Sequence, residues 1–75
     1  MREEIIQILT SIKAGVDYEQ ETRLIDARIL DSLAIIALVS ELSFAFDIEI
    51  DVMDLVPENL NSVDAMVCLV EELQE

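Results

Sequence analysis

Histidine is absent from this sequence, and cysteine, glycine and proline each occur once. The lone Cys68 has no partner in the chain for a disulfide, and without histidine a Cys/His zinc site has no ligand set. Nucleophilic arrangements that pair serine or cysteine with histidine are excluded for the same reason. A single glycine, Gly15, also excludes a glycine-rich phosphate-binding loop. Because the residues that most catalytic arrangements require are absent, we expect the chain not to be an enzyme.

Targeting and membrane signals are also missing. Met1 is followed by Arg2, Glu3 and Glu4, which is not the basic and then apolar pattern of a secretory signal. No apolar run approaches the roughly 20 residues that span a bilayer. With one cysteine and no disulfide, these features predict a reduced, cytoplasmic protein that is not embedded in a membrane.

Positive charge is scarce. The chain has four basic and 17 acidic residues, so its net charge is −13, and no basic residue follows Arg28. Such a surface repels nucleic acid and anionic membranes and attracts partners that carry basic patches. The 53% of apolar residues argues against disorder. We expect one domain over residues 1–75, a monomer with a thin core and a stability that depends on ionic strength.

Apolar spacing predicts an all-α fold, a small four-helix bundle with a long loop between helices one and two and a short third helix. The first helix is expected over about Arg2–Lys13, with Gly15 as its C-cap. The second begins at Asp31-Ser32 and ends near Phe46. The third lies near Val52–Leu55, and the fourth follows Ser62 as its N-cap.

The segments between these helices also give signals. The connection from Val16 to Leu30 is long for a compact domain and carries apolar residues that can pack on it. These residues are Leu24, Ile25, Ile29 and Leu30. After the second helix, Asp47–Ile50 alternates polar and apolar residues like an extended segment, and Pro57 is expected to stop the third helix. The side chains expected to face the core from the last helix are Val63, Met66, Val67, Val70 and Leu73.

The second helix is unusually apolar. Its sequence is an unbroken apolar run from Leu33 to Val39 and is nearly as apolar up to Phe46. A helix that is apolar on every side should be buried on every side, which a domain of this size cannot achieve. With Leu38, Leu42 and Phe46 turned inward, the expected exposed residues are Ile35, Ala37 and Phe44. Such a surface indicates a docking face, and the alternatives are a poorly optimised surface or additional burial under the long loop.

Two other possible functions are a calcium site, indicated by the spacing of acidic residues, and a reactive thiol at Cys68. Asp47, Glu49, Asp51 and Glu58 stand at positions 1, 3, 5 and 12 of a hypothetical calcium-binding loop. The position that requires glycine is Val52 instead, so an acidic calcium-binding protein is only a third hypothesis. The apolar neighbours of Cys68 predict an inert, packed thiol rather than a reactive one.

The tripeptide Asp31-Ser32-Leu33 remains. Asp31 is a good N-cap, so Ser32 should lie in the first turn of the second helix. Free backbone N–H groups and the positive end of the helix dipole would favour a phosphodiester on the Ser32 hydroxyl. The long preceding loop should leave that hydroxyl accessible to a modifying enzyme.

Three stretches together give the chain a resemblance to the acyl carrier protein family. They are Thr22–Asp26, Ile29–Leu33 and Phe46–Ile50, and the resemblance extends over essentially the whole chain. It implies a four-helix bundle whose serine, Ser32 here, receives phosphopantetheine from coenzyme A. The thiol of that arm would carry acyl groups as thioesters. Asp31 matches the acid that, in the family, helps to hold the metal used during arm transfer.

The resemblance also implies partners and weaker matches. The partners are a phosphopantetheinyl transferase, an acyl- or aminoacyl-activating ligase or transferase, and downstream biosynthetic enzymes such as those of fatty acid biosynthesis. Leu33 and Ile36 match apolar positions that flank the arm. Glu41, Asp47 and Glu49 match common surface positions without a demonstrable role.

The chain departs from the fatty-acid type of carrier. Ala34, Ile35 and Ala37 stand where acids are often found, and the segment from Ile50 to Ser62 is slightly longer. Both features resemble stand-alone D-alanyl carriers or the aminoacyl and peptidyl carriers of non-ribosomal synthesis. Docking should then be less electrostatic and more apolar. The main alternative is a helical interaction domain of the same fold without the arm.

Overall fold

Four α-helices and one 3-10 turn form the regular structure of residues 1–75 in the computed structural model, and there are no strands. The elements are α1 (Arg2–Ile12), α2 (Ser32–Phe46), the turn η1 (Val52–Asp54), α3 (Pro57–Leu60) and α4 (Val63–Gln74). The all-α prediction is confirmed, with its long connection between the first two helices and a short third helix.

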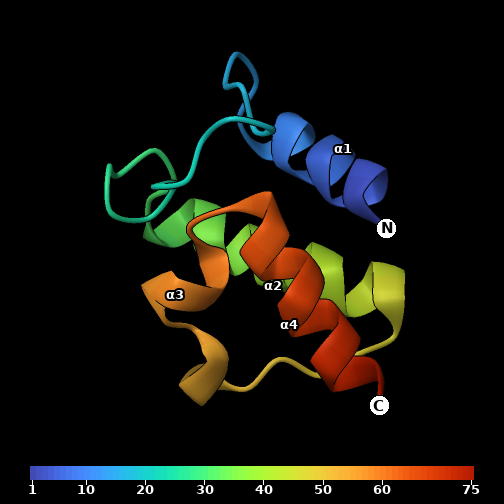
Figure 1. The fold of residues 1–75 in the computed structure, drawn as a ribbon. Helices are drawn as coiled ribbons and strands as arrows, with labels where there is room; N and C mark the ends of the chain where they lie inside the picture. Colours follow the sequence, from blue (N-terminus) through green and yellow to red (C-terminus); the bar gives the residue numbers. More distant parts are fainter.

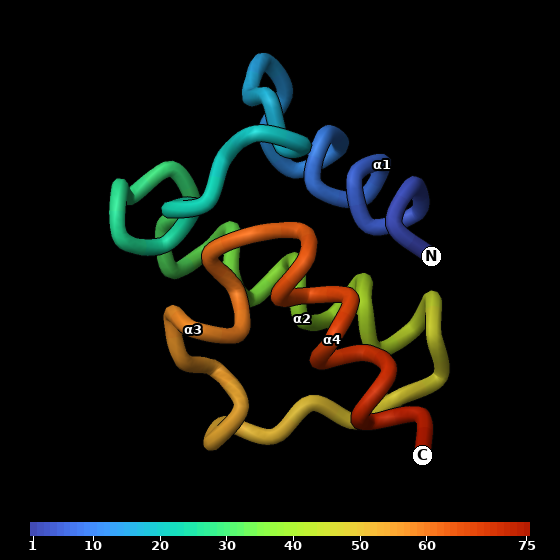
Figure 2. The backbone as a smooth tube through the Cα atoms, in the orientation of Figure 1, coloured from blue at the N-terminus to red at the C-terminus, as the bar shows by residue number.

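The helices enclose the core from three sides. α1 packs on α2 and on α4, while α3 packs against α4. In Figure 1, α1 lies across the top, α2 runs behind and α4 runs in front, with both termini on the same side. Figure 2 shows the connection between α1 and α2 at the upper left, beside the first turn of α2. The molecule measures 31 × 23 × 19 Å along its principal axes.

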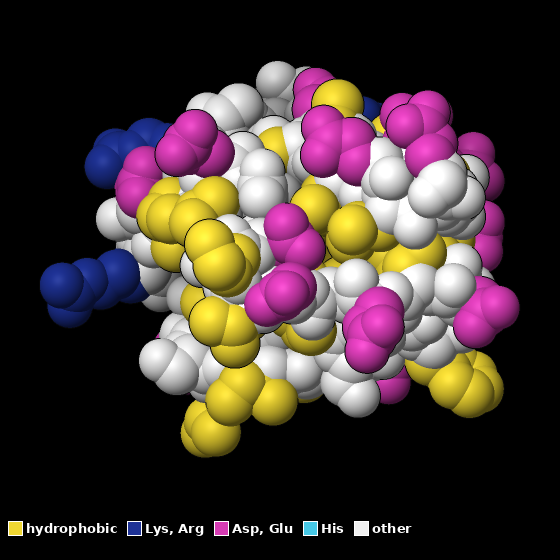
Figure 3. Space-filling view, turned by 90° about the horizontal axis from the view of Figure 1, so that it is seen from below, with side chains coloured by type: hydrophobic (Ala, Val, Ile, Leu, Met, Phe, Trp, Pro, Cys, Tyr) yellow, Lys and Arg dark blue, Asp and Glu magenta, His cyan; other side chains and the backbone are white.

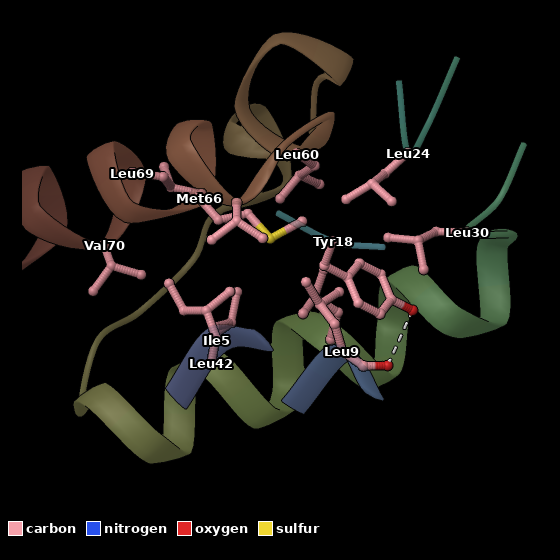
Figure 4. Packing of buried hydrophobic residues seen from close by; sticks show 12 residues of the cluster. Ile5, Leu9, Tyr18, Leu24, Leu30, Leu42, Leu60, Met66, Leu69 and Val70 are labelled. Atoms are coloured by element: carbon pink, nitrogen blue, oxygen red, sulfur yellow. Dashed lines mark hydrogen bonds between the residues drawn. The ribbon is translucent and has the colours of Figure 1, made fainter. Parts of the chain in front are cut away.

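The core consists of twelve buried hydrophobic side chains, most of them aliphatic (Figure 4). They are Ile5, Leu9, Tyr18, Leu24, Leu30, Leu38, Leu42, Leu60, Val63, Met66, Leu69 and Val70. The predicted core positions of α4 are thus confirmed for Val63, Met66 and Val70, while Val67 and Leu73 are partly buried against the same cluster. No buried side-chain nitrogen or oxygen lacks a hydrogen-bond partner.

Tyr18 joins the long loop to the end of α1. Its ring is buried, and its hydroxyl lies 3.2 Å from the Leu9 carbonyl oxygen and within hydrogen-bonding distance of the Lys13 carbonyl (Figure 4). The Lys13 carbonyl is among those that a helix leaves free at its C-terminus, while the Leu9 carbonyl also accepts from the N–H of Lys13. Burial raises the pKa of the Tyr18 phenol, so its ionisation would oppose folding as the pH rises above the ordinary tyrosine value of 10.0.

The prediction that Gly15 caps α1 is wrong. The helix ends at Ile12, and its cap is Lys13, whose backbone is extended (φ −146°) and whose N–H donates to Leu9. Gly15 does use the left-handed freedom of glycine, with φ +87°, but it does so within the loop. At the end of α1, the Tyr18 hydroxyl donates to the Lys13 carbonyl in place of a glycine cap.

Asn61 holds the loop at its other end. Its Oδ1 accepts from the N–H groups of Ile25 (2.9 Å) and Asp26 (3.0 Å), and its Nδ2 donates to Oδ2 of Asp26 (3.0 Å). Its backbone carbonyl accepts from the N–H of Leu24 (2.9 Å). One side chain between α3 and α4 therefore fixes the loop residues that lead toward α2.

We expect Asn61→Ala to lower the free energy of unfolding by about 1–3 kcal/mol, because it removes the acceptor of two backbone N–H groups. Asn61→Asp keeps that acceptor but sets a carboxylate oxygen against Asp26. In the double variant Asn61→Asp with Asp26→Asn, the amide introduced at position 26 can donate to the carboxylate introduced at position 61. This variant should recover most of the lost stability. Urea titrations of the four proteins measure this, and equal stability of Asn61→Asp with and without Asp26→Asn would contradict it.

The region after α2 corrects the prediction for the third helix. The segment Val52–Leu55 is not an α-helix: Val52–Asp54 forms the 3-10 turn η1, in which the N–H of Asp51 donates to Oδ2 of Asp54 and the N–H of Met53 donates to Oδ1 of Asp51. Pro57 does not stop a helix; it occupies the first position of α3. Proline suits that position because its missing N–H would have no partner there and its φ is already helical.

Asp47 ends α2 in the left-handed conformation, with φ 52° and ψ 52°. A non-glycine residue there is strained by about 1–2 kcal/mol, and a carboxylate is unfavourable at the negative end of a helix. We therefore expect Asp47→Gly to stabilise the fold by about 1 kcal/mol. Asp47→Asn removes the charge alone and should give a smaller gain. Thermal unfolding measures both, and a lower Tm for Asp47→Gly would contradict the backbone argument.

Candidate functional site

Ser32 is the first residue of α2 and is exposed. Asp31 precedes it as the N-cap, with its Oδ1 accepting from the N–H of Ala34 at 2.8 Å. The helix start predicted from the sequence is therefore confirmed at both residues. The extended backbone of Asp31 (φ −85°, ψ −178°) turns the chain from the loop into the helix, so the Ser32 hydroxyl lies at the surface beside the helix end.

The N–H groups of Ser32 and Leu33 donate to no acceptor in the chain, since the Asp31 carboxylate accepts from Ala34 and the Asp31 carbonyl accepts from Ile35. These two donors and the positive end of a 15-residue helix lie next to the Ser32 oxygen. An anion attached to that oxygen would find hydrogen-bond donors and a favourable potential. The donor set thus fits a phosphodiester on Ser32.

The segment before Ser32 is held on two sides. Within it, the N–H of Leu30 donates to the carbonyl of Leu24 (3.0 Å), which closes the loop on itself. From α1, Nζ of Lys13 donates to the carbonyl of Ile29 at 3.0 Å. Leu24 and Leu30 are also buried, so the backbone that precedes Ser32 is held in place.

One face of α2 leaves apolar side chains in solvent. Leu33 is 78% exposed, Ile36 65% and Phe44 91%, and in η1 Val52 and Met53 are exposed to a similar degree. Figure 3 shows hydrophobic side chains projecting among the acidic ones on the face seen from below. The exposed apolar surface predicted for this helix is therefore present.

The assignment of its residues needs correction. Phe44 and Ala37 are exposed as expected, and Leu38 and Leu42 are buried. Ile35, however, is partly buried against the core, and Ile36 is exposed in its place. The reason is the helical repeat: a position three residues before Leu38 faces the same way as Leu38. Phe46, expected inside, is partly buried.

Cys68 is also placed differently from the prediction. It is exposed rather than packed, because the residues of α4 that face the core are its neighbours Met66, Leu69 and Val70. Its apolar sequence neighbours indicated burial, whereas the helical repeat turns it outward.

The acidic residues do not converge. No group of three or more Asp, Glu, His or Cys side chains is arranged to hold a metal ion. In the stretch considered for calcium, Asp51 accepts from the N–H of Met53, and Glu58 belongs to the first turn of α3. None of the helices combines the length and the apolar character that crossing a bilayer requires.

An open groove of about 550 Å³ lies between the end of α1 and the first half of α2, next to Ser32. Asp31 and Leu33, the two sequence neighbours of Ser32, both line it. The other lining residues are Ser11, Ile12, Lys13, Ile29, Ala34, Ala37 and Glu41. No pattern in the sequence indicates this groove, because its two walls lie far apart in the chain.

The comparisons with known proteins add no relative: no protein-family model, no curated protein and no solved structure matches this chain.

Proposed function

We propose that this chain is an acyl carrier protein, holding acyl or aminoacyl groups as thioesters on a phosphopantetheine arm at Ser32. The observation that carries the proposal is the position of Ser32: an exposed hydroxyl at the first residue of an N-capped helix, beside two N–H groups without acceptors. The resemblance of the sequence around Ser32 and after α2 to this family supports it. The arm would come from coenzyme A through a phosphopantetheinyl transferase.

The residues of the chain would position the arm rather than react with the cargo. The N–H groups of Ser32 and Leu33 would donate to the phosphodiester, and the cap bond from Asp31 keeps those groups at the helix end. The second, free oxygen of Asp31 is available to the metal that a transferase brings. When bound, the arm supplies a thiol for thioester chemistry. The chain itself contributes effective concentration and orientation.

The exposed apolar face formed by Leu33, Ile36 and Phe44 is the surface we assign to partner enzymes. Since Ala34 and Ala37 replace acids there, contacts should depend on apolar burial more than on charge. Weak and rapidly reversible contacts suit a carrier that meets an activating ligase or transferase and then downstream enzymes. This composition favours an aminoacyl or other non-fatty-acid cargo, within a reduced, cytoplasmic setting.

An interaction domain without the arm is the second candidate. The same exposed face favours it, above all Phe44, which is 91% exposed and lies near the end of α2 remote from Ser32. Such a domain would bind its partner without any covalent change at Ser32.

A transferase assay separates the two. The purified chain is incubated with coenzyme A, Mg²⁺ and a broad-specificity phosphopantetheinyl transferase, and its intact mass is measured. The carrier should gain the mass of one arm, and a parallel reaction without Mg²⁺ should leave it unchanged. A chain that stays unmodified while a known carrier in the same tube is converted would reject the proposal and favour the arm-less domain.

A further inference from the structure

Unpaired positive charge collects in one part of the molecule. Arg2 is paired with Asp64. The other three basic side chains, Lys13, Arg23 and Arg28, are exposed and form no ion pair. Figure 3 shows Lys or Arg side chains projecting from the left edge, while acidic side chains are spread over much of the rest of this face. A chain with net charge −13 thus keeps three cations without acidic partners in the segment that connects α1 to α2.

The carboxylates near these arginines in the loop bond to other groups. Oε1 of Glu21 accepts from the backbone N–H of Arg23 at 3.1 Å, and Oδ2 of Asp26 accepts from Nδ2 of Asn61 at 3.0 Å. Neither the Arg23 nor the Arg28 guanidinium donates a hydrogen bond within the chain. Both guanidinium groups are therefore free to meet an anion from outside.

Arg28 also has a backbone conformation that a residue with a side chain disfavours. Its φ is +59°, in the left-handed region that glycine adopts without strain. Its N–H donates to the carbonyl of Ile25 at 3.0 Å, so the loop before Ser32 holds this conformation. Glycine would suit the backbone better, yet the position carries a long cation. A strained residue whose side chain has no partner within the protein points to a role outside it.

We propose that Arg28, assisted by Arg23, binds the 3′-phosphate of coenzyme A while the arm is transferred to Ser32. This inference rests on the carrier function proposed above. Arg28 lies four residues before Ser32, which is a backbone span of at most about 14 Å. A guanidinium suits a phosphate because it offers two parallel N–H donors and keeps its charge at every ordinary pH.

The chemistry of the transfer explains why a cation is useful there. The Ser32 Oγ attacks the phosphorus that bears pantetheine, so that a new O–P bond forms and the P–O bond to the nucleotide breaks. The leaving group is 3′,5′-ADP, which keeps the electron pair of that bond, and the Ser32 proton passes to a base of the transferase. The pyrophosphate has Mg²⁺ and the N–H groups of Ser32 and Leu33 as counter-charges, whereas the 3′-phosphate has neither. On so acidic a chain, the basic residues of the loop lower the repulsion of that phosphate.

The test is the rate of arm transfer to the full-length chain, followed by intact mass. It uses a transferase that accepts both coenzyme A and dephospho-coenzyme A, which lacks the 3′-phosphate. With coenzyme A, Arg28→Gln should lower kcat/KM for the chain about threefold to fivefold. With dephospho-coenzyme A, the wild-type chain and Arg28→Gln should react equally fast, because the group that Arg28 binds is missing.

Arg2→Gln is the matched control. It removes the same charge from the start of α1, which lies on the opposite side of Figure 1 from the loop before α2. It should leave the rate with both donors unchanged. If it slows the transfer as much as Arg28→Gln does, the effect comes from net charge alone and the inference is wrong.

Arg28→Gly separates binding from folding. It relieves the left-handed backbone, so it should raise the urea midpoint while it lowers the transfer rate as much as Arg28→Gln does. An Arg28→Gly protein that is folded and keeps the wild-type rate would overturn the inference.

The two donors also distinguish the partner of Arg28. If Arg28→Gln slows the transfer equally with both donors, the arginine meets an acidic surface of the transferase and not the 3′-phosphate. That result would overturn the inference and leave the carrier function intact. A wild-type chain that gains no arm would reject the carrier function and this inference together.

Discussion

Ser32→Ala is expected to abolish attachment of the arm completely while changing the free energy of unfolding by less than about 0.5 kcal/mol. The side chain of Ser32 makes no hydrogen bond within the protein, and alanine is well tolerated in a first helical turn. Attachment would therefore fail because the oxygen that receives the arm is missing, and not because the protein unfolds. Circular dichroism and urea titration check the fold, and intact mass checks the attachment.

Ser40→Ala is the matched control for this variant. Ser40 is an exposed hydroxyl on the same helix, about 12 Å further along its axis, and it lacks the free N–H groups of the helix start. It should accept no arm, so its removal should leave full attachment. A Ser32→Ala protein that still gains one arm, or a Ser40→Ala protein that does not, would show that the attachment site lies elsewhere.

Leu42→Ala is expected to remove much of the stability of the domain. Leu42 is fully buried in the core, and truncating a buried leucine costs about 2–5 kcal/mol. A domain of this size has about 4–11 kcal/mol in total, and the acidic surface reduces what is available. We expect Leu42→Ala to be partly unfolded at 37 °C, with a large fall in the urea midpoint.

Leu33→Ala is its control on the same helix. It removes the same atoms from a side chain that is 78% exposed, so stability should change by less than about 0.5 kcal/mol. Its effect should instead be on partner binding, since Leu33 belongs to the exposed apolar face. Equal destabilisation by the two substitutions would contradict the orientation of α2, on which both the exposed face and the groove depend.

The features predicted correctly from the sequence are those with local causes. Asp31 and Ser62 cap α2 and α4 as expected because an N-cap bonds to an N–H group three residues away in its own helix. The buried loop leucines, Leu24 and Leu30, could be anticipated because an apolar side chain in a long loop needs somewhere to pack. The position of Ser32 as an exposed helix start has the same local origin.

The features that sequence reasoning missed depend on partners far along the chain. The bonds of Asn61 to Ile25 and Asp26 join residues more than thirty positions apart, and an isolated asparagine gives no signal of them. Tyr18 is similar, since its role depends on where the end of α1 lies. The groove beside Ser32 is formed only when α1 packs on α2. By contrast, the exposure of Ile36 and Cys68 could have been found by applying the helical repeat strictly.

The most direct test of the central claim is to locate the arm within the chain. After reaction with coenzyme A and the transferase, cleavage at glutamates yields the peptide Thr22–Glu41, which contains both Ser32 and Ser40. Fragmentation of this peptide by mass spectrometry distinguishes the two hydroxyls. The carrier account predicts one arm on Ser32 and none on Ser40. A peptide without the arm, or an arm on any residue other than Ser32, would contradict it.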